Sequence, residues 1–174
     1  MKILFISDIH GYAQNLKNIE KCEYDHLVFL GDLYHRGYEN DAIFNNKAVE
    51  DFIKANRDKI ICIKGNCDSE YDYIKLNLPV SDSFVKITDE CLDIYCTHGH
   101  LYNYRNLSYL GSPGVIIYGH EHVPYIKCFN DMYYICVGSI SRPRYGSAAS
   151  YCLYEKRTFT LYSINGEIID KITI

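Results

Sequence analysis

The sequence predicts an α/β protein in which two β-sheets pack face to face with helices on the outside. Two observations lead to this prediction. In the first third of the chain, short apolar segments alternate with polar loops and helical patterns, an order that indicates parallel strands joined by right-handed crossovers. In the second half, apolar segments come in pairs separated by short turns, a pattern typical of antiparallel hairpins.

The elements of the first third follow from their apolar spacing. The helix that begins near Gly11 carries Leu16 and Ile19 at helical spacing, and the strands are runs of four or more consecutive apolar residues. In order, the expected elements are a strand over 3–7, a helix from Gly11 onward, a strand over 26–30, a helix over 41–56 and a strand over 59–64.

The second half is expected to contain two hairpins, a buried strand and a final meander. Turn residues such as Asn130-Asp131 and Asn165-Gly166 separate the paired strands. The expected strands are 84–87 with 91–96, then 115–118, then 126–129 with 132–137, and at the end 150–154, 158–164 and 167–172.

Composition narrows the class of protein. The 174 residues suit one domain with a real core, and 48% hydrophobic with 23% charged residues is ordinary for a soluble protein. The net charge of −4 argues against a general nucleic-acid or anionic-membrane binder, since those need clustered Lys and Arg. A small or exposed phosphate substrate is still compatible, because bound metal would reverse the local field.

The cysteines and the apolar runs indicate a cytoplasmic protein. Among the eight cysteines there is no C-x-x-C pair, and Cys62, Cys96, Cys136 and Cys152 fall inside apolar strand-like runs, so free buried thiols are expected. The start of the chain has four consecutive apolar residues before Asp8, too few for a signal peptide. No run approaches the ~18–20 apolar residues of a membrane span.

Polar residues with metal-binding side chains follow five of the expected strands. Ligand sites in sheets with crossover helices form just beyond the carboxyl ends of the strands. The segments are Asp8-Ile9-His10-Gly11, Gly31-Asp32, Gly65-Asn66-Cys67-Asp68, Thr97-His98-Gly99-His100 and Gly119-His120-Glu121-His122. Carboxylate oxygen, amide oxygen and imidazole nitrogen together suit Mn, Fe, Zn or a similar divalent ion.

Two of these segments contain pairs with a spacing of two residues. In a straight strand, both side chains of Asp8-x-His10 or of His120-x-His122 would point to the same face, so each pair could bind metal from one wall. Each residue also has an ordinary alternative: Asp8 could be a helix N-cap, Asp32 a turn residue, and Asn66 a loop residue in a left-handed conformation. The coincidence of all five segments in this order favours the metal site.

The order of the five motifs resembles the signature of the calcineurin-like metallophosphoesterase superfamily, which is D-x-H, GD, GN, H and GH-x-H. GNCD, THGH and GHEHVP are similar to the small single-domain bacterial and archaeal phosphodiesterases of that family, and the motifs extend from residue 8 to about 144. The resemblance implies one metallophosphoesterase domain over residues 1–174. Its implied fold is a four-layer α/β/β/α sandwich, two mixed β-sheets flanked by helices.

The resemblance also implies a binuclear metal centre. One divalent ion would be held by Asp8, His10, Asp32 and His122, and the other by Asp32, Asn66, His98 and His120. Asp32 would bridge ions ~3.5–4 Å apart that share an attacking hydroxide. Mn²⁺ is the expected metal, with Ni, Co, Fe or Zn as alternatives, and Asn66 is counted among the catalytic residues.

The sequence departs from the wider superfamily at Cys67, where most members carry a histidine that is thought to contact phosphate and assist the leaving group. A thiol donates only weakly, so His100 is a candidate proton donor in its place. If so, His100→Ala should slow hydrolysis of alkyl phosphodiesters far more than of nitrophenyl ones. Cys67 itself could be a substrate contact or a small filler beside the metals.

Four further residues complete the predicted site. Relatives commonly show Asn-Pro before Gly-Ser, where this chain has Cys136-Val137. The loop that follows keeps Arg142 and Arg144. These arginines could bind a substrate phosphate or could be solvated surface residues. His35 could line the substrate cleft or merely sit in its loop. Asp68 is expected to support the site by fixing Asn66 or a histidine.

The function predicted from these motifs is a metal-dependent phosphodiesterase acting on a small or exposed phosphate ester. The alternative is a non-catalytic scaffold that binds protein partners, like the small subunit of the eukaryotic retromer complex, which has this fold with partly eroded metal ligands. All seven expected ligands are present here, which favours the enzyme. A nuclease is disfavoured by the acidic charge, and a homo-oligomer is left open.

Overall fold

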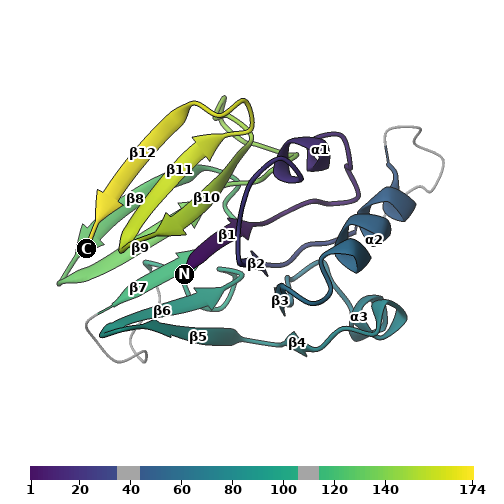
Figure 1. The fold of residues 1–174 in the computed structure, drawn as a ribbon, viewed down its shortest axis with the longest axis horizontal. Helices are drawn as coiled ribbons and strands as arrows, with labels where there is room; N and C mark the ends of the chain where they lie inside the picture. The colour runs from purple at the N-terminus through teal and green to yellow at the C-terminus, as the bar shows by residue number, and fades with distance from the viewer. Residues whose placement is uncertain (35–43, 106–113) are drawn as a thin grey trace.

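The computed structural model describes residues 1–34, 44–105 and 114–174, which form two mixed β-sheets and three helices. Figure 1 shows the sheets side by side, with the three helices gathered at one end. The predicted architecture of two mixed sheets is confirmed.

The first sheet has seven strands in the order β12-β11-β10-β1-β2-β3-β4. Strands β1 to β4 are parallel, as the repeat of strands and helices predicted, whereas β10 pairs antiparallel with β1 and starts an antiparallel meander. The strands are β1 (Lys2–Ile6), β2 (His26–Phe29), β3 (Ile60–Ile63), β4 (Val80–Ser81), β10 (Ser150–Glu155), β11 (Thr158–Ser163) and β12 (Ile168–Thr173). The C-terminal meander thus extends the first sheet, and the division into a parallel half and an antiparallel half does not coincide with the division into sheets.

The second sheet has five strands in the order β5-β6-β7-β9-β8. Both predicted hairpins, β5 with β6 and β8 with β9, are antiparallel, while β7 lies parallel to β6 on one side and to β9 on the other. The strands are β5 (Phe84–Asp89), β6 (Leu92–Thr97), β7 (Val115–Tyr118), β8 (Pro124–Phe129) and β9 (Met132–Val137).

The helices are α1 (Leu16–Ile19), α2 (Asn46–Ala55) and α3 (Glu70–Leu76). The first is shorter than the helix expected from Gly11, and α2 occupies the described part of the helix expected over 41–56, of which 41–43 lie outside the described residues. Helix α3 was not predicted. Its start was nevertheless readable, because Ser69 and Asp72 form a reciprocal capping box.

Strands β1 and β2 are buried on both faces, which explains their continuous apolar sequences, whereas β12 at the edge of the sheet is mostly exposed. In β1, Ile3 and Phe5 pack between the sheets, while Leu4 and Ile6 pack against the helices. Among the described residues no helix covers the second sheet, whose outer face carries a tyrosine-rich cluster that includes Tyr118 and Tyr134. The described part of the chain also contains no helix long and apolar enough to cross a membrane.

The loops that leave β1, β2 and β3 are tied to one another and to the loop after β9. The Asp8 amide donates to the Gly31 carbonyl (3.0 Å), and the Ile140 amide donates to the Ser7 carbonyl (3.2 Å). The carboxyl ends of strands from both sheets therefore meet in one place, where the predicted ligands lie.

Candidate metal centre

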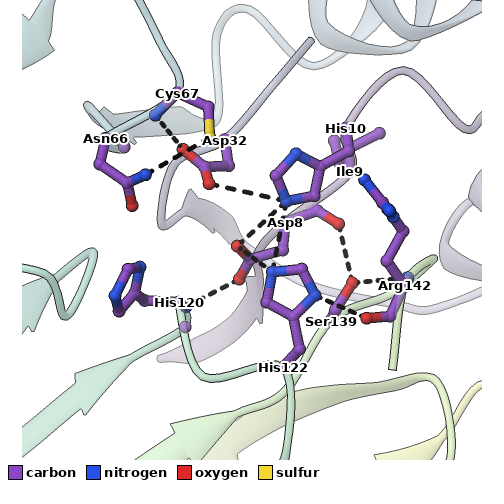
Figure 2. Close-up of polar contacts among 12 residues, drawn as sticks. Asp8, Ile9, His10, Asp32, Asn66, Cys67, His120, His122, Ser139 and Arg142 are labelled. Atoms are coloured by element: carbon purple, nitrogen blue, oxygen red, sulfur yellow. Dashed lines mark hydrogen bonds and ion pairs between the residues drawn. The ribbon is translucent and has the colours of Figure 1, made fainter. Parts of the chain in front are cut away.

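Six of the seven predicted ligands have side-chain polar atoms close to one another beyond these strand ends. Figure 2 labels five of them: Asp8, His10, Asp32, Asn66 and His122. The first group holds three buried side chains. Asp8 Oδ1 lies 3.6 Å from His10 Nε2 and 3.2 Å from His122 Nε2, and the two imidazole nitrogens are 3.3 Å apart. Two ligands bound at ~2.0–2.2 Å to one ion are separated by about 3–3.5 Å, so these spacings suit a shared cation.

Asp32 lies between the first group and a second one. Its Oδ2 is 3.6 Å from His10 Nε2 on one side and 3.5 Å from His98 Nε2 on the other. His98 Nε2 in turn is 3.0 Å from Asn66 Oδ1. A carboxylate in this position can contact ions in both groups at once.

The hydrogen bonds of two histidines determine which ring nitrogen faces the site. His98 Nδ1 lies 2.7 Å from the Leu30 carbonyl oxygen, and His122 Nδ1 lies 2.5 Å from that of Arg142. A carbonyl oxygen accepts only, so each Nδ1 carries a proton and each Nε2 is the ring nitrogen that faces the carboxylates, where it can offer a lone pair to a cation.

The result is a buried cluster of carboxylate, amide and imidazole lone pairs that exceed the hydrogen-bond donors around them. Asp8 Oδ1 is buried and receives no hydrogen bond from the described residues. Lone pairs from carboxylate, amide and imidazole repel one another unless a cation lies among them, and this mixture suits a divalent transition metal. The residues therefore fit the ions implied by the sequence.

Five of the seven predicted ligands have a left-handed backbone, with φ between 48° and 63°. Non-glycine residues seldom adopt it, and such strain concentrates at functional sites. The five are Asp8, His10, Asp32, His120 and His122.

The straight-strand interpretation of the two spaced pairs was wrong, because the residues lie past the ends of β1 and β7 in this left-handed conformation. Asp8 and His10 still reach one group. His122 joins them, whereas the His120 ring lies edge-on to His98, with ring centroids 5.1 Å apart. The two rings of the second pair thus lie apart, and the assignment of His120 to the second group stays a prediction.

Asp68 holds the backbone on which Asp32 stands. Its carboxylate accepts hydrogen bonds from the amides of Asp32 (2.8 Å), Leu33 (2.7 Å) and Gly65 (2.9 Å), and from the Tyr73 hydroxyl (2.7 Å). The expected supporting role is present, but its described partners are backbone amides and a tyrosine rather than Asn66 or a histidine.

The loop after β9 holds the backbone of Asp8, a role that the sequence did not reveal. Ser139 Oγ and Ser141 Oγ both donate to the Asp8 carbonyl, at 2.8 and 2.9 Å. Ser139 Oγ also accepts the amide of Arg142 (2.8 Å). Gly-Ser directly after a buried strand was the available signal, but it carries no indication of its partner.

The charges of the site affect two titrating groups. Burial alone would raise the pKa of Asp8. Without a bound cation, protonation of His10, His122 and His98 supplies hydrogen bonds and positive charge that hold this pKa well below its usual range. Burial, with the Asp32 carboxylate, raises the pKa of the Cys67 thiol to about 11, so this side chain is a neutral, weak donor. The Cys67 amide donates to Asp32 Oδ1 (2.8 Å).

The other predicted residues lie around this centre. The His100 ring lies 5.3 Å from that of His98, and its Nδ1 is buried without a hydrogen bond from the described residues. Arg142 and Arg144 are exposed, and their backbones form hydrogen bonds with His122. The Arg142 carbonyl accepts from His122 Nδ1, and the Arg144 amide donates to the His122 carbonyl (3.1 Å). His35 lies outside the described residues.

Comparison with known families agrees with this geometry. Residues 1–158 match the calcineurin-like phosphoesterase superfamily domain. The chain belongs to this superfamily. Membership confirms the predicted family and the prediction of an enzyme that hydrolyses phosphoric esters, and the superfamily implies divalent metal ions.

Individual members of the superfamily resemble the chain over most of its length. Phosphodiesterase YfcE of Escherichia coli strain K12 is 31% identical over 176 residues, which cover 97% of this chain and 95% of YfcE. The probable metallophosphoesterase YsnB of Bacillus subtilis strain 168 is 29% identical over 164 residues, which cover 88% and 83% of the two proteins.

Solved structures extend the comparison. The structure of YfcE, described as a phosphoesterase from E. coli, superimposes with a TM-score of 0.88 and 30% identity and covers both chains completely. Vps29 from Entamoeba histolytica, complexed with zinc, gives a TM-score of 0.64 at 17% identity over 99% of this chain and 98% of Vps29. At that identity the likeness to Vps29 concerns the fold alone.

Proposed function

We propose that the protein hydrolyses phosphodiesters with two divalent ions bound among Asp8, His10, Asp32, Asn66, His98, His120 and His122. The observation that carries the proposal is the position of Asp32, whose Oδ2 lies at 3.6 and 3.5 Å from imidazole nitrogens of the two groups. When bound, the ions would supply Lewis acidity and a hydroxide nucleophile shared between them. The name of YfcE, a phosphodiesterase, supports the diester as substrate.

The chain's own residues would hold both sides of the reaction. Asp8, His10 and His122 would present one oxygen and two nitrogens to the first ion, and Asn66, His98 and His120 would serve the second. The hydrogen bonds at His98 Nδ1 and His122 Nδ1 orient the rings before any ion enters. The hydrogen bonds of Asp68 to the Asp32 loop do the same for the bridging carboxylate.

The substrate phosphate would lie over the ions, in contact with the side chains at the rim of the site. The hydrogen bond from the Cys67 backbone amide to Asp32 Oδ1 positions Cys67 to contact the phosphate, and as a neutral thiol it would donate weakly. Arg142 would bind oxygens of this phosphate through its guanidinium group, whereas Arg144 would bind a phosphate elsewhere on the substrate. A position for His35 in the substrate cleft stays a prediction from the sequence alone.

His100 remains the candidate proton donor for the leaving group. Burial and the charges of His98 and His120 lower its pKa, which favours the neutral ring at pH 7 and limits its strength as an acid. The comparison of alkyl with nitrophenyl esters in His100→Ala therefore decides this role. Equal slowing of both substrates would remove it.

The remaining expectations belong to the same proposal. We expect Mn²⁺ as the resident ion, one domain over residues 1–174, and a cytoplasmic enzyme. All eight cysteines are free, and Cys62, Cys96, Cys136 and Cys152 are buried as predicted, which supports a reducing compartment. The oligomeric state remains to be measured.

The direct test is hydrolysis of bis-p-nitrophenyl phosphate by protein that is first stripped of metal and then supplied with Mn, Ni, Co, Zn or Mg. Asn66→Ala removes one proposed ligand, and Asn165→Ala, in the exposed turn between β11 and β12, is the matched control. We expect metal-restored turnover that falls at least 100-fold in Asn66→Ala and is unchanged in Asn165→Ala.

Absence of turnover with every ion, while metal still binds, would contradict the proposal. It would instead favour the non-catalytic scaffold, and the next experiment would be a search for a protein partner.

A further inference from the structure

A cavity of about 280 Å³ borders the metal centre, and His120 is the one proposed ligand in its lining as the described residues define it. Its volume is at the small end of ligand pockets, which span about 300–1,000 Å³, so it suits a small group rather than a whole large ligand. The lining residues are Asn103, Arg105, His120, Glu121, Val123, Arg144 and Tyr145.

One wall of this cavity is tied to the first ligand group through the loop after β9. The Arg144 amide donates to the His122 carbonyl (3.1 Å), and Ser147 Oγ donates to the same carbonyl (3.2 Å) and to the Arg144 carbonyl (2.8 Å). Within the described residues the Arg144 guanidinium has no hydrogen bond or ion pair. Its position is thus fixed at the backbone, while its charged end remains available.

A second part of the lining, Asn103 and Arg105, is tied to the segment that carries His98. Asn103 Nδ2 donates to the Gly99 carbonyl (2.7 Å), and Asn103 Oδ1 accepts the Arg105 amide (2.8 Å). The Arg105 guanidinium donates through Nε to the Tyr104 hydroxyl (2.8 Å) and lies 5.0 Å from the centroid of that ring. This bond uses one of its five N–H groups, so the others can bind a ligand.

The charge of the cavity is positive on an otherwise acidic chain. Arg105 and Arg144 outnumber Glu121 in the lining, whereas the whole chain carries −4. Tyr145 stands at the rim with 94% of its surface exposed and a left-handed backbone (φ 53°), which leaves a ring face open to a ligand. Two guanidinium groups around a small cavity are suited to a phosphate or carboxylate.

We infer that this cavity binds a second anionic group on the substrate, so that the preferred esters carry a phosphate or carboxylate a few bonds from the scissile phosphodiester. The inference rests on the proposed function, since it assigns the part of the substrate that lies away from the ions. Arg105 and Arg144 hold the second anion, and His120 forms the boundary between the cavity and the ions.

The test uses two substrates that differ by one phosphate. Thymidine 5′-(p-nitrophenyl phosphate), with and without a 3′-phosphate, releases the same nitrophenolate in both cases, so the ratio of the two kcat/KM values reports on the distal group. We expect the 3′-phosphate to raise kcat/KM about tenfold, as for one charge-assisted hydrogen bond. Arg105→Gln and Arg144→Gln should each bring this ratio toward one.

Arg57→Gln is the matched control, because this exposed arginine lies after α2 and donates to the Asn77 carbonyl. It should keep the wild-type ratio. A wild-type ratio of one, or a ratio unchanged in Arg105→Gln and Arg144→Gln, would overturn the inference while the phosphodiesterase proposal stood.

If neither ester is hydrolysed, the proposed function fails and calorimetry decides the inference separately. Titration of Mn²⁺-loaded protein with thymidine 3′,5′-bisphosphate and with thymidine 5′-monophosphate compares the same distal group without turnover. Tighter binding of the bisphosphate that Arg144→Gln abolishes would sustain the inference, and equal binding would overturn it.

Discussion

Replacing Asp68 with asparagine tests whether this buried carboxylate holds Asp32 in place. Its Oδ1 accepts one backbone amide, and its Oδ2 accepts two amides and the Tyr73 hydroxyl. Asparagine keeps one oxygen. If that oxygen takes the place of Oδ2, three bonds persist without the charge, and the new NH₂ group faces the Leu33 amide, a donor against a donor.

The cost follows from this count. One buried amide left without a partner costs about 1–3 kcal/mol, and each of the three remaining bonds weakens by about 1 kcal/mol when the acceptor becomes neutral. Asp68→Asn should therefore destabilise the fold by about 4–6 kcal/mol. Because the Asp32 loop then loses its support, Mn²⁺ affinity should fall about 10–100-fold.

Urea unfolding of the metal-free protein measures the first quantity, and calorimetric titration with Mn²⁺ measures the second. Tyr73→Phe is the matched control: it removes the hydroxyl, which donates to Asp68 at 2.7 Å, and leaves the three amide bonds. It should cost about 1 kcal/mol and leave Mn²⁺ affinity unchanged. If Asp68→Asn matches Tyr73→Phe in both measurements, Asp68 does not position Asp32.

Three further changes have defined outcomes. In Gly119→Ala the new Cβ would collide with Ser7 Oγ, so urea unfolding should show a free energy of unfolding lower by about 2 kcal/mol or more. Gly146→Ala is the control, because its Cβ meets nothing within 4 Å, and it should cost about 1 kcal/mol. The hydrogen bond from Lys75 lowers the pKa of Glu50, so the carboxylate stabilises the fold above pH ~4.5 and this contribution disappears as the pH falls through the lowered pKa. Glu50→Gln should thus cost up to about 1 kcal/mol at pH 7 and progressively less as the pH falls through the lowered pKa of Glu50, and a difference that grows in acid would contradict this. Mn²⁺ should raise Tm and excess EDTA should reverse the rise, since the ion binds the folded state alone; an unchanged Tm in differential scanning fluorimetry would refute metal binding.

The predictable part of the site was local in sequence. An apolar run followed closely by Asp8, Asp32 or Asn66 specifies both a strand and the polar residue beyond its end, and parallel pairing of β1, β2 and β3 brings these ends together without further information. The fold was predictable for the same reason, since the alternation of elements is visible in the residues themselves.

What could not be predicted depends on backbone turns and on partners distant in the chain. The left-handed conformations at His120 and His122 direct these two side chains apart, and nothing in their spacing indicates this. Asp68 and Ser139 support residues 36 and 131 positions away, Asp32 and Asp8 respectively, through backbone atoms that every residue possesses. Such contacts leave no mark in the sequence.

The left-handed backbone at five proposed ligands has a consequence for how easily the activity can be lost. Each such residue costs the fold about 1–2 kcal/mol relative to an unstrained position, and the crowded lone pairs add repulsion when no ion is present. Glycine at one of these positions would relieve both penalties while it removed a ligand. Selection for stability alone would therefore erode the metal centre first and keep the sandwich, which leaves a stable fold available for a purely binding role.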